Sequence, residues 1–429
     1  MIRLLYNLLF PFVLLAFLPG YVLKMLRRGN YRSKFGQRLG FYDQETRTRL
    51  APGGCTWLHA VSVGEVMIAL KLAAALKERE PKLKVALTTT TTTGFALALR
   101  HPQSWIEVLY TPLDFWPIMC RAFQLIRPAR IILVEAEIWP NLTALAQRRA
   151  IPLALVNARL SPRSEQRFHR FLLFVRPYFR NLDLLCVQEP EDVSRWQSLG
   201  VNPDRIQLVG SIKFDPENVV SSPAAPRAFL EKIGIAPDQP ILLAGSTHPG
   251  EEEILGRIYL ELHREFPGLL LIIAPRHVER ARELEQLFRN LGLTSVRRSI
   301  GLPGSTDCLL LDTTGELRDW YGVATVVFIG KSLTAKGGQN PVEAIIAGRP
   351  VVFGPHMENF AALARTLVAR GGALQPNDES GLTSSLGELL RDPQRRNSLA
   401  AAALEVLAPH RGATARTAAL LQRLSSTGS

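Results

Sequence analysis

The first 42 residues of this 429-residue chain contain no aspartate or glutamate. They hold an apolar run, residues 4–23, preceded only by Arg3. A cleaved signal peptide carries its positive charge before the apolar core, so this pattern argues against a secretory signal. Twenty helical residues span roughly 30 Å, the thickness of the hydrocarbon core of a bilayer. Residues 1–42 are therefore predicted to be a membrane anchor with a basic juxtamembrane segment that contains Lys24, Arg27, Arg28, Arg32, Lys34 and Arg38.

The position of these charges predicts that the rest of the chain lies on the cytoplasmic side of the membrane. Asn7, Pro11, Pro19 and Gly20 interrupt the apolar run, so a helix that lies in the membrane interface is the alternative to a spanning helix. Either arrangement places the globular part beside an anionic lipid surface.

Several common functional motifs are missing. The four cysteines are far apart without a Cys-x-x-Cys pair, the eight histidines show no metal-ligand spacing, and no Asp-x-Asp occurs. These absences argue against a zinc site, a disulfide framework and a nucleotide-bound divalent cation. There is also no Walker loop and no G-x-S-x-G elbow. The net charge of +13 indicates anionic partners, but no nucleic-acid-binding pattern accompanies it, so phosphorylated lipids or nucleotides fit better.

Short apolar runs alternate with amphipathic stretches of helix length along the rest of the chain. Almost continuous apolar strands between helices predict parallel sheets covered on both faces. The length exceeds that of a single core, so we expect two doubly wound α/β domains, residues 43–214 and 228–429, joined by a Pro- and Ser-containing linker at 215–227. The expected strands are 56–60, 85–89, 108–110, 130–135, 152–157, 184–188 and 206–209, followed by 240–244, 269–274, 308–311, 325–329 and 350–353.

Ligands of such folds bind beyond the carboxyl ends of the strands, and several charged residues fall at these positions. Glu65 is a candidate general base, although Ser62-x-x-Glu65 is also the pattern of a helix capping box. Glu135 and Glu137 leave the most apolar strand of the first half, and one of them could instead cap the helix expected from Pro140.

Other candidates lie near the predicted linker and in the second half. Lys213 could stabilise developing charge, or it could be an ordinary surface lysine. Arg276 and His277 could bind phosphate at a helix start. In residues 337–343, two glycines allow close approach of the backbone to a ligand, and Glu343 could accept hydrogen bonds from ribose hydroxyls; a glycine-rich loop before a helix is the alternative.

In their order and spacing, nine segments resemble the bacterial 3-deoxy-D-manno-octulosonic acid (Kdo) transferases over most of the chain. The resemblance implies the GT-B fold, in which two Rossmann-like domains face a cleft, with no required metal or cofactor. It also implies CMP-Kdo as donor, the lipid A precursor (lipid IVA) as acceptor, and lipopolysaccharide biosynthesis at the cell inner membrane. The segments are residues 31–42, 59–65, 135–142, 157–161, 210–215, 246–252, 275–277, 337–343 and 354–356.

The resemblance also implies roles for individual residues. Glu65 matches the proton acceptor of the family, and Glu135 and Lys213 match positions that stabilise the transition state. The CMP-binding positions match Pro275, Arg276, Gly315, Glu316, Leu317, Asn340, Pro341, Val342 and Glu343.

This sequence departs from the family pattern at three positions. Gln339 stands where histidine is frequent, Val342 replaces leucine, and Lys331 stands where glycine is commoner. These departures concern the details of donor binding.

The expected reaction is an inverting transfer in which Glu65 deprotonates a sugar hydroxyl of the acceptor, which then attacks the anomeric carbon of Kdo as CMP leaves. Two alternatives follow from the sequence: another lipid-linked GT-B transferase that uses a UDP-sugar, and a membrane-tethered nucleotide-binding module without turnover.

Overall fold

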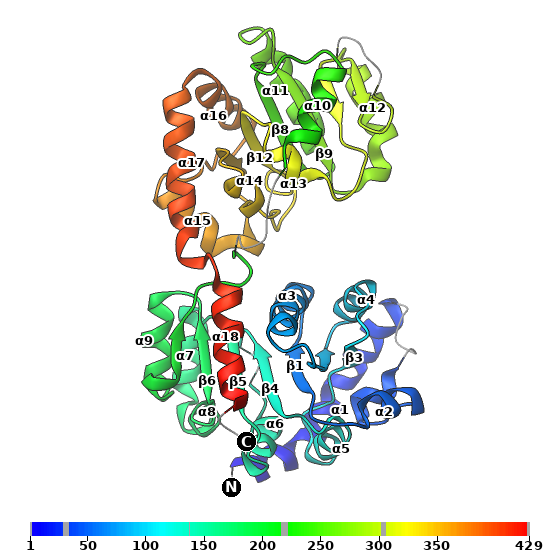
Figure 1. The fold of residues 1–429 in the computed structure, drawn as a ribbon, viewed down its shortest axis with the longest axis vertical. Coiled ribbons are helices and arrows are strands. Elements are labelled where there is room, and N and C mark those ends of the chain that lie inside the picture. The colour runs from blue at the N-terminus through cyan, green and yellow to red at the C-terminus, as the bar shows by residue number, and fades with distance from the viewer. Residues whose placement is uncertain (1, 29–33, 137, 216–221, 302–305, 427–429) are drawn as a thin grey trace. The chain divides into compact units, whose positions relative to one another are not determined.

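The computed structural model describes residues 2–28, 34–136, 138–215, 222–301 and 306–426. The chain divides into two compact units. Unit 1 consists of Met1–Asp215 and His410–Ser429, and unit 2 is Pro216–Pro409. Each unit contains its own parallel sheet with helices around it, as Figure 1 shows.

The seven-stranded sheet of unit 1 has the order β3-β2-β1-β4-β5-β6-β7, with every pair parallel. The order reverses between β1 and β4, which is where doubly wound sheets bind ligands. Every residue of β1, β2, β4, β5 and β6 is buried, as expected for strands covered on both faces. The strands are β1 Thr56–Ala60, β2 Val85–Thr89, β3 Ile106–Tyr110, β4 Arg130–Val134, β5 Leu153–Ala158, β6 Leu184–Val187 and β7 Ile206–Leu208.

Two apolar cores lie on the opposite faces of this sheet. Alternating residues of one strand enter different cores: Trp57 packs with Phe123 and Trp196, whereas Leu58 packs with Leu72 on the other face. The helices of unit 1 are α1 Ile2–Arg28, α2 Gln44–Leu50, α3 Val63–Arg79, α4 Thr92–Arg100, α5 Trp116–Ile126, α6 Pro140–Arg148, α7 Pro162–Arg170, α8 Leu172–Phe179, α9 Pro190–Ser198 and α18 Ala413–Ser426, with 3-10 turns η1 Phe35–Leu39 and η2 Pro203–Arg205.

The six-stranded sheet of unit 2 has the order β10-β11-β9-β8-β12-β13, again with parallel pairs. Its strands are β8 Ile241–Thr247, β9 Leu270–Pro275, β10 Ser295–Arg297, β11 Cys308–Leu310, β12 Val326–Ile329 and β13 Val351–Phe353. Its helices are α10 Ala224–Lys232, α11 Glu251–His263, α12 Ala281–Asn290, α13 Leu317–Tyr321, α14 Val342–Ile346, α15 Ala361–Ala369, α16 Glu379–Arg391 and α17 Pro393–Leu407, with η3 Val278–Arg280, η4 Glu358–Phe360 and, at the return to unit 1, η5 Ala408–His410.

The two doubly wound parallel sheets confirm the predicted fold class, and all twelve predicted strands are present with ends shifted by at most three residues. The sequence missed β10. This strand has three half-buried residues and includes Arg297, so it carries no continuous apolar run that would have revealed it.

The predicted end of the second domain is wrong. Residues 410–429 belong to unit 1, because α18 packs against α3 and buries Ala418 and Leu421 in the core that contains Leu72. The predicted linker 215–227 lies partly outside the described residues, and α10 already begins at Ala224.

The predicted anchor forms α1, and its first half docks on unit 1. Asn7 and Asn141 exchange side-chain hydrogen bonds of 2.8 and 3.0 Å, and the backbone N–H of Trp116 donates to Asn7 Oδ1 at 3.0 Å. Phe10 stacks on Phe115. In the described part of the chain, none of the helices combines the length and the hydropathy needed to cross a bilayer. The apolar side chains of α1 that remain exposed include Leu4, Leu8, Phe12 and Leu15.

Candidate active site

Unit 1 brings four charged residues together at the carboxyl edge of its sheet. Glu65 lies in the first turn of α3 after β1, Glu135 follows β4, Arg159 follows β5 and Lys213 follows β7. Glu135 interacts electrostatically with each of the other three. The structure therefore unites the three predicted catalytic residues of unit 1 and adds Arg159.

The Glu65 carboxylate closes the N-terminus of α3. Its Oε2 accepts a hydrogen bond from the Val61 N–H at 2.8 Å and its Oε1 one from the Ser62 N–H at 3.2 Å, while its own N–H donates to Ser62 Oγ at 3.3 Å. This is the capping box that the sequence offered as the structural alternative. A carboxylate has about four acceptor positions, so two backbone donors leave room for a substrate hydroxyl. The side chain is 7% exposed, and the capping contacts fix its position.

Glu135 occupies a strained position between Glu65 and the basic residues. Its φ of 65° is left-handed, a conformation that costs a residue other than glycine about 1–3 kcal/mol and that gathers at functional sites. Burial, and then repulsion from Glu65, raises the pKa of Glu135, while Lys213 and Arg159 oppose the rise. Burial lowers the pKa of Lys213; Glu135 opposes this and Arg159 adds to it. The cluster thus combines two carboxylates with two cations, and burial shifts the pKa values of Glu135 and Lys213 toward their neutral forms.

The turn that carries Lys213 is fixed from two sides. Asn157 Oδ1 accepts hydrogen bonds from the Ile212 N–H at 2.9 Å and from Ser211 Oγ at 3.4 Å. Lys71 Nζ, on the same helix as Glu65, donates to the carbonyls of Ile212 and Asp215 at 3.2 and 2.7 Å. Asn157 and Lys71 therefore position the lysine relative to the two glutamates, a role the sequence reasoning did not assign to them.

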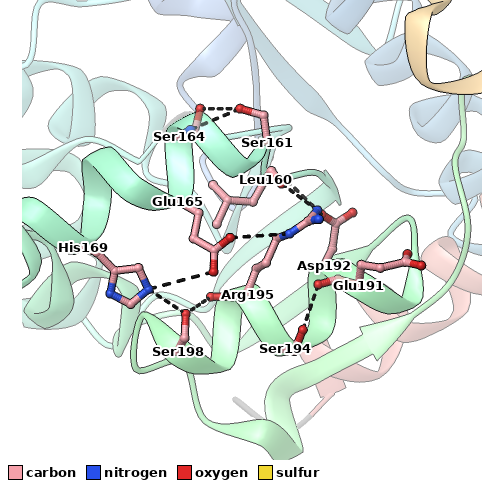
Figure 2. A network of polar contacts seen from close by, with 10 residues as sticks. All are labelled: Leu160, Ser161, Ser164, Glu165, His169, Glu191, Asp192, Ser194, Arg195 and Ser198. Carbon is pink, nitrogen blue, oxygen red and sulfur yellow. Dashed lines mark hydrogen bonds and ion pairs between the residues drawn. The ribbon is translucent and has the colours of Figure 1, made fainter. Parts of the chain in front are cut away.

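Arg159 lies in one of the segments that carry the family resemblance, residues 157–161, but the sequence analysis gave it no role of its own. A network from α9 holds the turn in which it lies: the Leu160 N–H donates to Asp192 Oδ1 at 3.1 Å, and Arg195 Nη1 donates to the Leu160 carbonyl at 3.0 Å (Figure 2). Arg195 also pairs with Glu165 of α7 at 3.5 Å. The signal was available, because Arg159 directly follows an apolar strand, as the other candidates do. Glu137, the other candidate on this edge, lies outside the described residues.

In unit 2 the predicted donor-binding residues also follow strands. Pro275 ends β9, and the N–H of the exposed Arg276 donates to the Thr247 carbonyl at 3.0 Å. Past β11, Gly315 has a φ of 87°, a conformation that suits glycine, and Glu316 accepts from Arg298 Nε at 3.2 Å. Leu317 then begins α13.

The last predicted segment follows β12 and lies beside α13. Asn340 Oδ1 accepts from the Val342 N–H at 3.1 Å, and Pro341 is the N-cap of α14. Helices α13 and α14 pack together, and Glu343 Oε1 forms an ion pair with Arg318 Nη2 at 3.9 Å. The structure thus gathers the residues after β9, β11 and β12 at the carboxyl edge of the second sheet, where a nucleotide would bind.

Glu251, to which the sequence reasoning gave no separate role, holds the loop that leads to Asn340. It is fully buried and accepts four backbone hydrogen bonds of 2.7–3.0 Å, from His248, Lys331, Ser332 and Leu333. Lys331 has a left-handed φ of 57°, which explains in physical terms why glycine suits this position.

Among the residues that the structure describes, no group of three or more His, Cys, Asp or Glu side chains could hold a metal ion. The charged clusters of both units combine carboxylates with cations. Such a set can accept a proton and stabilise a phosphate leaving group.

Comparison with known proteins identifies the family. Residues 33–216 match the family model described as 3-deoxy-D-manno-octulosonic-acid transferase (kdotransferase). The 3-deoxy-D-manno-octulosonic acid transferase of Bordetella pertussis is 36% identical, over 84% of this chain and 85% of its own length. The chain belongs to the Kdo transferase family. The enzyme of the same name from Haemophilus influenzae is 32% identical over 91% of both chains. Family membership confirms that this protein is a glycosyltransferase and a Kdo transferase.

The fold extends beyond this family. UDP-GlcNAc 2-epimerase from Neisseria meningitidis is similar with a TM-score of 0.55, covering 87% of this chain and 99% of that one at 12% identity. At this identity the likeness concerns the fold alone, which is the two-domain GT-B arrangement expected for a Kdo transferase.

Proposed function

We propose that this Kdo transferase moves Kdo from CMP-Kdo to the lipid A precursor, lipid IVA, with inversion at the anomeric carbon. The observation that carries the proposal is the cluster of Glu65, Glu135, Arg159 and Lys213 at the switch point of unit 1, in a chain of this family. A buried carboxylate beside a second acid and two cations is a suitable environment for removing a proton from a sugar hydroxyl.

In the proposed reaction, Glu65 takes the proton of an acceptor hydroxyl, and the oxygen of that hydroxyl bonds to the anomeric carbon of Kdo. The bond from that carbon to the phosphate oxygen of CMP breaks, and CMP leaves with the electron pair. Arg276 and the backbone N–H groups after β9, β11 and β12 would stabilise the phosphate of CMP. Lys213 and Arg159 would keep Glu135 ionised and balance charge that develops around the attacking oxygen.

We also propose that the enzyme works at the cytoplasmic face of the inner membrane, attached through α1. Asn7 is hydrogen-bonded to Asn141 and Trp116, so the first half of α1 lies along the surface of unit 1. The exposed apolar side chains recur at positions 4, 8, 12 and 15, which is the spacing of one helix face. Such a helix binds in the headgroup region of a bilayer. Co-sedimentation with anionic vesicles, strong for the full chain and weak for a Leu8→Glu, Phe12→Glu variant, supports this attachment, and equal binding of both would refute it.

The direct test of function is incubation of the full chain with CMP-Kdo and purified lipid IVA. We expect CMP to be released and the acceptor to gain the mass of Kdo in mass spectrometry. Parallel incubations with UDP-sugars distinguish a UDP-sugar donor from CMP-Kdo. Release of UDP without release of CMP would contradict the proposal. CMP binding without any product would indicate a nucleotide-binding module instead.

A further inference from the structure

Unit 1 contains an apolar pocket that the proposed chemistry does not use. Its volume is about 390 Å³, within the range of ligand-binding pockets. It lies among α1, α8 and the start of α6, and its lining includes Tyr6, Leu9, Trp139, Phe174 and Val175.

The inner part of the pocket is bordered by the chain segment that follows Glu135. Ala136 lines the pocket and directly follows Glu135 in the chain. Trp139 also lines it, and its indole Nε1 is buried with no hydrogen-bond acceptor among the described residues. A buried indole N–H normally has a partner, so an acceptor oxygen of a bound molecule would complete this site.

The outer part of the pocket opens between two exposed apolar surfaces. Leu5 and Leu9 of α1 and Phe174 of α8 line the pocket, although each is about half exposed. Beside them, Leu8 is 64% and Leu173 is 81% exposed. Exposed apolar surface of this extent marks an interaction site, and here it is continuous with the face of α1 proposed to contact the membrane.

The charge around the opening favours an anionic lipid over an ordinary protein partner. Along α7, α8 and the residue after α8, a single acidic side chain, Glu165, accompanies five exposed arginines. Basic side chains beside an apolar insertion surface recognise phosphorylated or otherwise anionic headgroups. The arginines are Arg163, Arg167, Arg170, Arg176 and Arg180.

We propose that this pocket holds one acyl chain of the glycolipid acceptor, which enters from the membrane surface and brings the sugar end toward Glu135 and Glu65. The inference rests on the proposed function for the identity of the acceptor. The Trp139 N–H would donate to the carbonyl oxygen of the acyl linkage. The pocket would thus select acylated acceptors and orient the reacting hydroxyl.

The experiment uses the full-length chain and an acceptor analogue with a photoreactive diazirine at the end of its acyl chains, without any CMP-Kdo. We expect cross-links to peptides of α1 and α8, because the end of the acyl chain lies away from Trp139, which would bind the carbonyl oxygen of the acyl linkage. Val175→Trp, which fills the pocket, should reduce these cross-links at least about tenfold, because excluding even two methylenes from an apolar site costs that much affinity. Leu9→Trp fills the pocket from the α1 side and serves as a second variant. The matched control is Leu99→Trp, the same kind of change at an exposed leucine of α4 that is outside the pocket lining.

A kinetic comparison completes the test. The ratio of kcat/KM for the acylated acceptor to that for the same acceptor after removal of its acyl chains should fall in Val175→Trp and Leu9→Trp and stay unchanged in Leu99→Trp. Equal cross-linking of all three variants, or an unchanged ratio in both pocket variants, would overturn the proposal. The pocket variants could reduce cross-linking while the wild-type protein releases no CMP from CMP-Kdo. That result would refute the proposed transfer and would still support the pocket as a lipid site.

Discussion

At the scale of single residues, the observed capping role of Glu65 is compatible with its proposed role as general base, although the sequence presented the two as alternatives. The capping contacts from Val61 and Ser62 hold the carboxylate in one place, and a fixed carboxylate is what a general base requires. Glu135, in a left-handed conformation, and Lys213, held by Asn157, complete the arrangement.

Glu65→Gln separates the two tasks. Glutamine also serves at the third position of a capping box, so thermal stability and CMP-Kdo binding should stay close to wild type. The rate of transfer should fall about 10²–10⁴-fold, because glutamine cannot accept the proton. Ser62→Ala is the control: it should cost about 1 kcal/mol of stability with a small effect on rate. Equal losses of donor binding and turnover in Glu65→Gln would leave only the capping role.

Lys213→Met tests the electrostatic coupling within the cluster. Lys213 lowers the pKa of Glu135, which burial raises, so removing the positive charge should raise this pKa further. If ionised Glu135 is the active form, the acidic limb of the profile of kcat/KM against pH moves to higher pH in the variant. Methionine keeps the length of the side chain. A profile that is only lower, with its acidic limb unmoved, would contradict the coupling.

At the scale of elements, Asp114 joins three helices. Its carboxylate accepts hydrogen bonds from the N–H groups of Asn141 and Leu142 at 2.9 and 3.0 Å, so it caps the N-terminus of α6. Asp114 itself directly precedes the N-cap residue of α5. It also hydrogen-bonds to Tyr6 of α1. The helix N-cap itself, Trp139, makes no side-chain capping bond. One buried carboxylate therefore contributes both to the start of α6 and to the docking of α1, two of the elements that border the apolar pocket.

Asp114→Asn should lower the free energy of unfolding by about 1–3 kcal/mol, because the amide can accept only one of the two backbone hydrogen bonds and leaves a buried donor unpaired. Urea denaturation measures the change, and proteolysis of α1 should become faster. Asp43→Asn is the matched control, since Asp43 is the exposed N-cap of α2, where asparagine caps equally well. Equal stability losses in the two variants would show that Asp114 does not have this joining role.

At the scale of the whole molecule, the chain returns to unit 1 after completing unit 2. Leu421 of α18 is buried against α3 and its neighbours, and Arg130 Nη1 donates to the Leu421 carbonyl at 3.0 Å. Asp215 accepts hydrogen bonds from the N–H groups of Gly412 and Thr414 at 2.8 Å each. The two crossings between the units are thereby tied together at the surface of unit 1, so the stability of unit 1 depends on α18.

Leu421→Ala should destabilise unit 1 by about 2–5 kcal/mol through loss of buried apolar contact and the cavity that remains. In hydrogen exchange, the amides of β1 and α3 should lose protection while those of β8 and β9 keep theirs. Leu404→Ala, in α17 of unit 2, is the control because that leucine is 43% exposed and should cost far less. Loss of protection in unit 2 alone would contradict the assignment of α18 to unit 1.

The sequence predicted the strands well because most of them are short, mainly apolar runs, and such runs are a local signal along the chain. It also identified the charged residues that follow these strands. It could not place the end of the second domain, since the amphipathic pattern of α18 is compatible with packing on either sheet. It likewise assigned no role to Arg159 or Asn157, whose importance lies in contacts with residues far away in the chain.

The sequence by itself determined the two parallel sheets, the candidate acids and cations, and the family. Hydrophobic pattern and motif order are properties of the order of residues along the chain, so the sequence alone reveals them. Only the tertiary structure decided that Glu135 adopts a left-handed backbone, that Asn157 holds the turn of Lys213, and that α1 docks through Asn7 beside an apolar pocket. The reason is physical: hydrogen-bond partners, burial and shifted pKa values arise from segments that the fold brings together across more than a hundred residues of chain.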